Sequence, residues 1–115
     1  MMKKRWLGTL ALLVLTPAHA ADSAAKATKA VTLAKQNSCF SCHAKDKKLV
    51  GPAFQDVAQR YKNNALAKKQ LIQKIKIGGA GQWGVIPMPA HPNLNAEELK
   101  ILAEWVLAGA NGSPQ

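Results

Sequence analysis

The sequence predicts an all-α fold, a single small domain of four to five helices. Four segments repeat apolar residues at the i, i+3, i+4 spacing of an amphipathic helix, and no segment alternates apolar and polar residues as a half-buried strand does. The chain has only 115 residues, with two cysteines and six residues of Phe, Tyr and Trp. Since a domain of this size buries a modest fraction of its surface, we expect a bound group to fill part of the core.

The first three helices are predicted from apolar stripes in residues 27–34, 54–61 and 71–75. Lysines that flank the first stripe lie mainly off it. The third helix should end at Gly78 and Gly79, because glycine stops helices readily. The residues of the three stripes are Ala27, Ala30, Val31 and Ala34; Phe54, Val57, Ala58 and Tyr61; and Leu71, Ile72 and Ile75.

The last helix has start and stop signals of its own. Asn95 and Glu98 have the spacing of a capping box, and Leu94 and Leu99 that of a hydrophobic staple. Gly109 should end the helix. Its apolar side consists of Leu99, Ile101, Leu102, Trp105 and Val106. The three residues 112–114 that follow are expected to form a frayed tail.

The N-terminus predicts a cleaved secretory signal peptide over residues 1–20. Lys3, Lys4 and Arg5 precede a short apolar run, and Ala18-His19-Ala20 forms a small-x-small cleavage site. A membrane anchor needs about 20 apolar residues, more than this run contains. The mature chain would then be one domain, residues 21–115, exported to the periplasm.

Both cysteines and one histidine occur together as Cys39-Phe40-Ser41-Cys42-His43. A thioredoxin-type dithiol uses this spacing, but it belongs in an alternating pattern of strands and helices that the chain lacks. A structural zinc site needs four ligands, and His91 is the only further Cys or His of the mature chain. A plain disulfide would leave His43 unexplained. Cys-x-x-Cys-His is the attachment site of a c-type haem.

Each residue of this motif has a task in haem attachment. The Cys39 and Cys42 thiols would add to the two vinyl groups and form thioether bonds, and the His43 imidazole would then reach the iron as proximal ligand. The apolar haem macrocycle would also fill the part of the core that so small a domain lacks. We therefore expect one covalent haem c, with the helices wrapped around it.

Residues 78–93 form a loop rich in glycine and proline that holds the methionine predicted as second axial ligand. Pro87 and Pro89 stiffen the backbone on both sides of Met88, the single methionine of the mature chain. A thioether paired with histidine is a known haem ligand set that raises the reduction potential. His91 is the rival ligand, although we expect its side chain to face solvent, as loop histidines commonly do.

Four pieces in order, CFSCHAKD, VGPAF, QWGVIPMP and LAEWVL, resemble the small bacterial class I cytochromes c, the monohaem periplasmic type that donates electrons to nitrite reductase or terminal oxidases. The resemblance implies that His43 and Met88 bind the iron and that the Pro52 carbonyl accepts a hydrogen bond from His43. It further implies contacts of Trp83 and Lys74 with a haem propionate. His91 departs from the family, which often has asparagine near the methionine sulfur.

With both axial positions filled, the iron can only change oxidation state, so we expect a one-electron carrier and not an enzyme. The alternatives are an open-site haem enzyme, peroxidase-like or gas-binding, and a haem subunit of a larger oxidoreductase. Loss of Lys3, Lys4 and Arg5 with the signal peptide would lower the formal charge from +10 to +7. The remaining basic excess favours redox partners with acidic docking surfaces, and an exposed haem edge would favour apolar ones. Examples of such partners are nitrite reductase, a terminal oxidase and quinol-cytochrome c reductase. We expect a monomer with no nucleic-acid partner and at most peripheral membrane contact.

Overall fold

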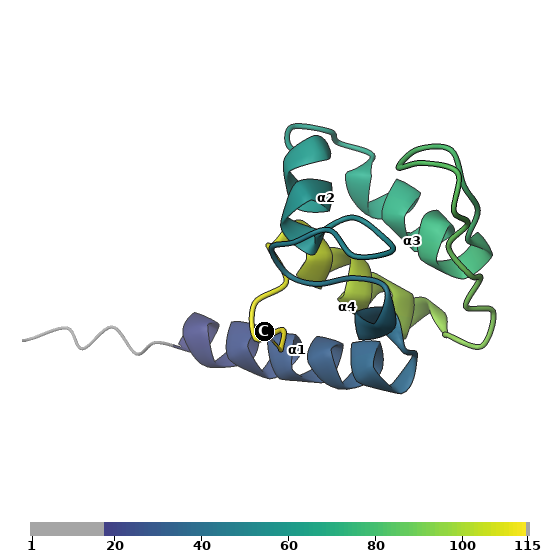
Figure 1. The fold of residues 1–115 in the computed structure, drawn as a ribbon. Coiled ribbons are helices and arrows are strands. Elements are labelled where there is room, and N and C mark those ends of the chain that lie inside the picture. The colour runs from purple at the N-terminus through teal and green to yellow at the C-terminus, as the bar shows by residue number, and fades with distance from the viewer. Residues whose placement is uncertain (1–17, 115) are drawn as a thin grey trace, which may run out of the picture.

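The computed structural model describes residues 18–114, and these fold into four α-helices and one 3-10 turn (Figure 1). In chain order they are α1 (Ala18–Gln36), η1 (Cys39–Ser41), α2 (Phe54–Arg60), α3 (Ala67–Ile77) and α4 (Ala96–Leu107). Within residues 18–114 there is no β-strand, only two isolated bridges, His43 with Lys48 and Gly79 with Met88. The predicted all-α fold is therefore confirmed.

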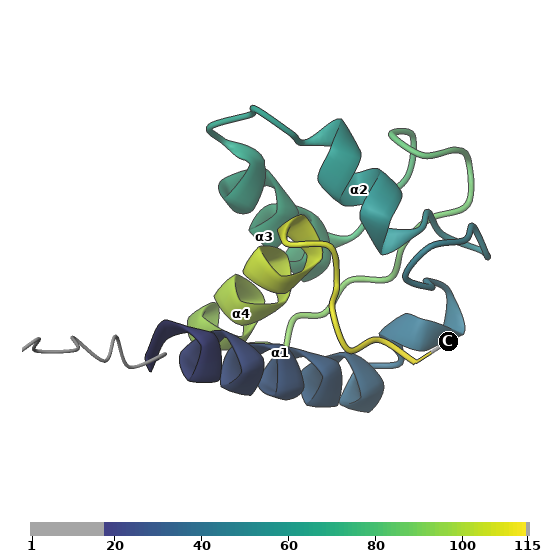
Figure 2. The same ribbon diagram turned by 90° about the vertical axis from the view of Figure 1, so that its left-hand side faces the viewer.

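Helix α4 lies at the centre and packs against α1, α2 and α3. Figures 1 and 2 both show α1 along one side of α4, with α2 and α3 on the other. This central position explains why half of the α4 residues are buried, whereas α1 buries a narrow stripe. The buried residues of α4 are Leu99, Ile101, Leu102, Ala103, Trp105 and Val106, and those of α1 are Ala30, Leu33 and Ala34.

The predicted start of α4 is confirmed. The Glu98 N–H donates to the Asn95 side-chain oxygen over 3.0 Å, and the Asn95 N–H donates to the Glu98 carboxylate over 2.9 Å. Leu94 and Leu99 are both buried in the same core, as a hydrophobic staple requires. These bonds satisfy backbone donors that have no partner inside the helix.

Gly109 ends α4 as predicted, at a φ of 95°. Its N–H bonds the Val106 carbonyl, and the Ala110 N–H bonds that of Trp105, which is the Schellman arrangement. The predicted frayed tail, residues 112–114, is wrong at Ser113, whose hydroxyl donates to the Ala110 carbonyl over 2.7 Å. Just before the tail, the Trp105 indole donates to the Asn111 carbonyl over 2.8 Å.

An aromatic cluster connects α4 with the haem-motif segment. The rings of Phe40, Phe54 and Trp105 meet edge to face, with centroids 5.1–6.2 Å apart. Such pairs contribute about 0.5–1.5 kcal/mol each beyond the burial of their area. The cluster fixes the segment that contains both cysteines against the hydrophobic core.

The predicted signal peptide, residues 1–20, lies mostly outside the described residues, and α1 begins at Ala18 within it. Its cleavage stays a prediction. Among residues 18–114, no helix is long and apolar enough to cross a membrane.

Candidate functional site

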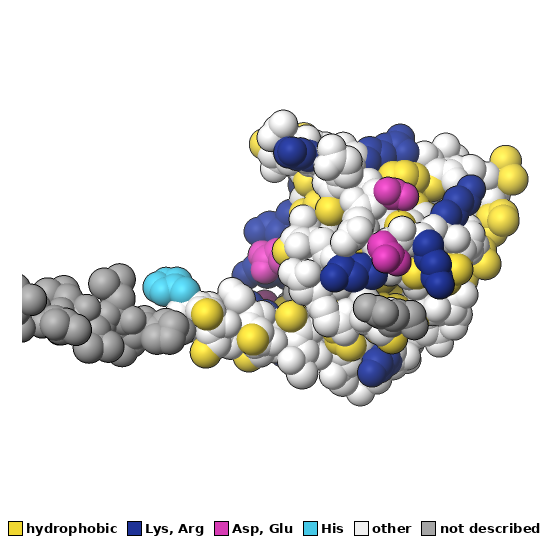
Figure 3. All heavy atoms as spheres, turned by 60° about the vertical axis from the view of Figure 1, so that its left-hand side comes forward, with side chains coloured by type: hydrophobic (Ala, Val, Ile, Leu, Met, Phe, Trp, Pro, Cys, Tyr) yellow, Lys and Arg dark blue, Asp and Glu magenta, His cyan; other side chains and the backbone are white. Residues whose placement is uncertain are grey.

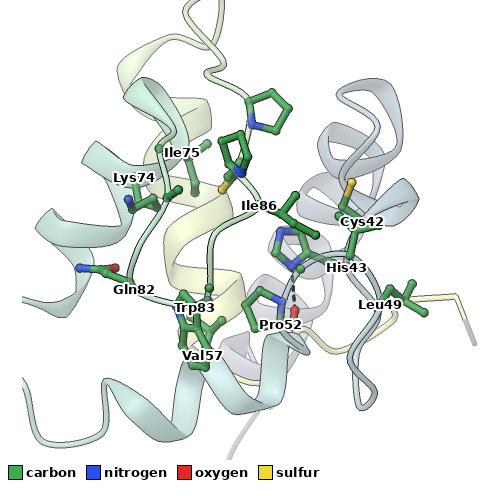
Figure 4. A pocket seen from close by; sticks show the side chains of 18 of the residues that line it. Cys42, His43, Leu49, Pro52, Val57, Lys74, Ile75, Gln82, Trp83 and Ile86 are labelled. Atoms are coloured by element: carbon green, nitrogen blue, oxygen red, sulfur yellow. Dashed lines mark hydrogen bonds between the residues drawn. The ribbon is translucent and has the colours of Figure 1, made fainter.

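A cavity of about 480 Å³ opens between the segment after η1, helices α2 and α3, and the loop before α4. Figure 4 shows Cys42 and His43 on one side of it and Lys74 and Ile75 of α3 on the other. Its volume lies in the range of about 300–1,000 Å³ that is usual for cofactor sites. Most of the lining side chains are apolar and include Leu49, Val50, Phe54, Val57, Leu71, Ile75, Val85, Ile86 and Val106.

The His43 ring at this cavity is held in one orientation. Its Nδ1 lies 2.7 Å from the Pro52 carbonyl oxygen (Figure 4). Because that oxygen can only accept, Nδ1 is the donor and Nε2 keeps its lone pair for a metal. The Phe54 ring stacks on the imidazole at 5.1 Å. On another side is Gly51, where an added Cβ would lie 2.5 Å from the His43 Cε1.

Cys39 is the first residue of the short turn η1, and Cys42 follows its last residue. Both are free and half-buried, and Cys42 lines the cavity. Burial raises the pKa of the Cys39 thiol, because the charged thiolate is disfavoured there. A raised pKa is the opposite of what a reactive redox dithiol needs. Over residues 18–114, no group of three or more His, Cys, Asp and Glu is arranged to hold a metal ion.

Met88 lines the same cavity from the loop that follows α3. Its N–H donates to the Gly79 carbonyl over 2.9 Å, and the Gly79 N–H donates to the Met88 carbonyl over 3.0 Å. Gly78 permits this pairing, because its φ is 71° and any Cβ there would overlap the Met88 carbonyl oxygen. The glycine pair predicted to stop α3 thus also positions Met88.

The match to a known family accounts for this arrangement. The model of the family described as "Cytochrome c" matches residues 27–110. The chain belongs to the cytochrome c family.

Individual relatives agree with this assignment. This cytochrome is 42% identical over 106 residues to cytochrome c-552 of Nitrosomonas europaea, which covers 92% of this chain and 97% of that one. It is 48% identical over 76 residues to cytochrome c-551 of Pseudomonas aeruginosa, covering 66% and 72%. The crystal structure of wild-type Nitrosomonas europaea cytochrome c552 superimposes with a TM-score of 0.65, at 44% identity, over 68% of this chain and 96% of that one.

These comparisons confirm the predicted resemblance to small class I cytochromes c, and they favour an electron-transfer protein over an enzyme. The cytochrome's own residues also fit the haem c that the family implies. The cavity has an apolar lining, a histidine whose free nitrogen can bind iron, a methionine thioether and a cysteine at its edge.

Lys74 and Trp83 of the cytochrome both line the cavity, as Figure 4 shows. The Lys74 ammonium group is directed to the end of its own helix, where it donates to the Gly78 carbonyl over 3.4 Å. Trp83 is 37% exposed at the rim. Their expected contact with a propionate stays a prediction.

Sequence reasoning missed Arg60, which joins α2 to the Met88 loop. Its guanidinium lies 4.5 Å above the centroid of the Trp83 ring, and it bonds the Gln82 carbonyl over 2.6 Å. The neighbouring Tyr61 hydroxyl bonds the Gln82 side chain over 3.3 Å. The one feature of the sequence that could have pointed to Arg60 is its rarity, since it is the only arginine after Arg5.

The expectation that His91 faces solvent is wrong. The residue is half-buried, and its Nδ1 lies 3.2 Å from the Ile75 carbonyl oxygen of α3. The ring turns away from solvent because the carbonyl groups at the end of α3 have no partner inside the helix and can accept a hydrogen bond from it. His91 is not among the residues that line the cavity, whereas Met88 is.

Proposed function

We propose that this cytochrome is a periplasmic one-electron carrier with one haem c, attached by thioethers to Cys39 and Cys42 and ligated axially by His43 and Met88. One observation carries the proposal. A histidine with a free Nε2 and a methionine, from segments far apart in the sequence, line one apolar cavity next to the Cys-x-x-Cys-His motif.

The residues around the iron would restrict it to electron transfer. When bound, haem supplies a one-electron couple between ferrous and ferric iron. The Pro52 carbonyl holds the His43 ring in the orientation that an iron ligand needs. Its hydrogen bond to Nδ1 also makes the lone pair of Nε2 more basic and so a better metal ligand. The Met88 thioether would favour the ferrous state and raise the reduction potential. With both ligands bound, the iron would offer no open position to a substrate such as peroxide.

Two further residues would act at the edge of the site. The Lys74 ammonium group and the Trp83 indole line the cavity and can both donate hydrogen bonds to a propionate. Lysine supplies charge there without the two-pronged geometry of arginine.

The surface supports a redox-protein partner with an acidic or apolar docking surface. Of the 16 Lys and Arg, 13 lie in residues 21–115, against six Asp and Glu, and Figure 3 shows basic side chains over one face of the domain. Four apolar side chains at the cavity, Leu49, Val50, Val85 and Ile86, are 43–91% exposed. Exposed apolar side chains beside Lys48 and Lys74, which line the same cavity, suit fast, weak association of a monomeric carrier.

Intact-mass spectrometry of protein expressed with residues 1–20 tests haem attachment and cleavage of the signal peptide together. We expect the mass of residues 21–115 plus one haem. Replacing Cys39 or Cys42 by alanine should leave at most one thioether and strongly reduce the yield of holoprotein. A wild-type mass equal to the bare chain with a disulfide would contradict the proposal.

Optical spectroscopy tests the ligands. The wild type should be low-spin, with the weak long-wavelength sulfur-to-iron band of the ferric state. Met88→Ala should abolish this band and lower the potential, because the thioether stabilises ferrous iron. Asn93→Ala, at an exposed residue of the same loop that does not line the cavity, is the matched control and should change neither the band nor the potential. A wild-type spectrum that Met88→Ala leaves intact would exclude Met88 as the ligand.

A further inference from the structure

The Met88 segment is fastened to the C-terminal end of α3 at two places. The first is the reciprocal pair of backbone hydrogen bonds between Met88 and Gly79. The second is His91, whose N–H lies 3.1 Å from the Ile75 carbonyl and 3.2 Å from that of Lys76. The His91 ring adds a third bond at this point, from Nδ1 to the Ile75 carbonyl.

These carbonyls are available because α3 ends at Ile77. The last four carbonyl groups of a helix have no partner inside it, and Ile75 and Lys76 are two of those residues. The His91 Nδ1 must be the donor, since a carbonyl oxygen only accepts. One hydrogen bond from the ring therefore gives the Ile75 carbonyl a partner and also attaches the loop to α3.

The segment around Met88 has few other means of attachment. Pro87, Pro89 and Pro92 carry no N–H, so the backbone donors of residues 87–92 are confined to three positions. Arg60 holds the earlier part of the loop at Gln82, and the His91 ring is one of the few donors that can hold the part after Met88.

We propose that His91 is a positioning residue for Met88: its ring hydrogen bond to Ile75 keeps the Met88 loop closed on the cavity and so keeps the thioether on the iron. This inference rests on the proposed function, in which Met88 is the distal ligand. His91 itself does not line the cavity, and its Nδ1 is engaged by α3. It acts through the loop and not as a ligand.

The test is the rate at which cyanide, added to the ferric holoprotein, displaces Met88. Two variants of His91 are compared. Asparagine has an amide nitrogen at the δ position, where it can replace the Nδ1 donor of histidine. Leucine has the same branched shape as asparagine but no hydrogen-bond donor. We expect His91→Leu to bind cyanide roughly 2- to 10-fold faster than the wild type, the effect of losing one hydrogen bond. His91→Asn should restore most of the wild-type rate.

A general loss of stability must be separated from loosening of the loop. Asn95→Ala removes the cap of α4, away from Ile75, and should lower the unfolding free energy without changing the cyanide rate. If His91→Leu and Asn95→Ala shift the rate equally for an equal loss of stability, His91 is only a cap for α3 and the inference is wrong. Equal rates for wild type, His91→Leu and His91→Asn would overturn it as well.

Failure of the proposed function has a different signature. A wild-type ferric spectrum without the sulfur-to-iron band would remove Met88 as ligand before any His91 variant is compared. Should His91→Leu yield no holoprotein, His91→Gln takes its place, because it keeps the amide but moves it one carbon farther from the backbone. Its cyanide rate should exceed that of His91→Asn, and an equal or lower rate would count against the inference.

Discussion

Gly51→Ala should disturb His43 directly, because no side chain other than hydrogen fits between this backbone position and the imidazole. An added Cβ would lie 2.5 Å from Cε1, 2.9 Å from Nδ1 and 3.0 Å from Nε2 of His43. Gly51 is not among the glycines with positive φ, so alanine meets no backbone strain there. The perturbation is therefore purely steric and falls on the predicted iron ligand.

Its magnitude follows from the overlap. Carbon atoms in ordinary contact are about 3.5–4.0 Å apart, so the new Cβ would overlap Cε1 by roughly 1 Å. Relief requires that the ring turn or that residues 49–52 move. Overpacking of this kind costs about 1–3 kcal/mol. If the ring turns, loss of the hydrogen bond between His43 and Pro52 adds about 0.5–1.5 kcal/mol.

Denaturant and thermal unfolding of the holoprotein measure the decrease in unfolding free energy. For a domain of this size, each kcal/mol lost should lower the melting temperature by about 4–8 °C. The ligand-field spectrum and reduction potential should change with it. Gly109→Ala is the control, since its φ of 95° brings strain, an added Cβ meets no atom within 4 Å, and the residue does not line the cavity. It should destabilise without altering the spectrum. Wild-type stability and potential in Gly51→Ala would refute the packing of His43 on Gly51.

Three further predictions concern other parts of the molecule. Asn95→Ala removes one half of the capping box and should lower the unfolding free energy by about 1 kcal/mol, measured by urea denaturation; no change would mean that the cap is dispensable. Arg60→Lys keeps the charge but loses the planar stacking on Trp83, so it should cost about 0.5–1 kcal/mol in the same assay, while Lys69→Arg, at an exposed residue of α3, serves as the control. Stopped-flow electron transfer to an acidic redox partner should slow as salt increases, since charges are screened beyond about 8 Å at physiological ionic strength; a rate independent of salt would favour an apolar contact.

The sequence was most informative where one local signal decides the structure. The capping box at Asn95 and Glu98, the stop at Gly109 and the end of α3 at Gly78 depend on residues within one turn of each other, and the structure has all three. The Cys-x-x-Cys-His motif is likewise local and predicted the haem, whereas the family was predicted from this motif and three further short pieces in order.

The features that sequence reasoning missed depend on partners distant along the chain. Arg60 reaches Gln82 and Trp83 across the loop, and His91 reaches Ile75 of α3. A lone arginine at the end of a helix, or a lone histidine in a loop, belongs to no apolar periodicity, so its environment is decided only when the elements pack. The same holds for Gly51, whose role is visible only with His43 placed beside it.

Backbone hydrogen bonds hold both predicted ligand segments. The Gly51 N–H donates to the Cys42 carbonyl over 2.7 Å, and that of Phe54 to the Ala44 carbonyl over 2.9 Å, which closes the loop on either side of His43. On the other segment, Met88 is paired with Gly79 through both of its backbone groups. A carrier benefits from ligands that keep their positions in both oxidation states, because each transfer then requires little rearrangement. In this fold, glycines at the points of closest approach make such backbone pairing possible, and the ring of His91 adds the side-chain bond that secures the methionine loop.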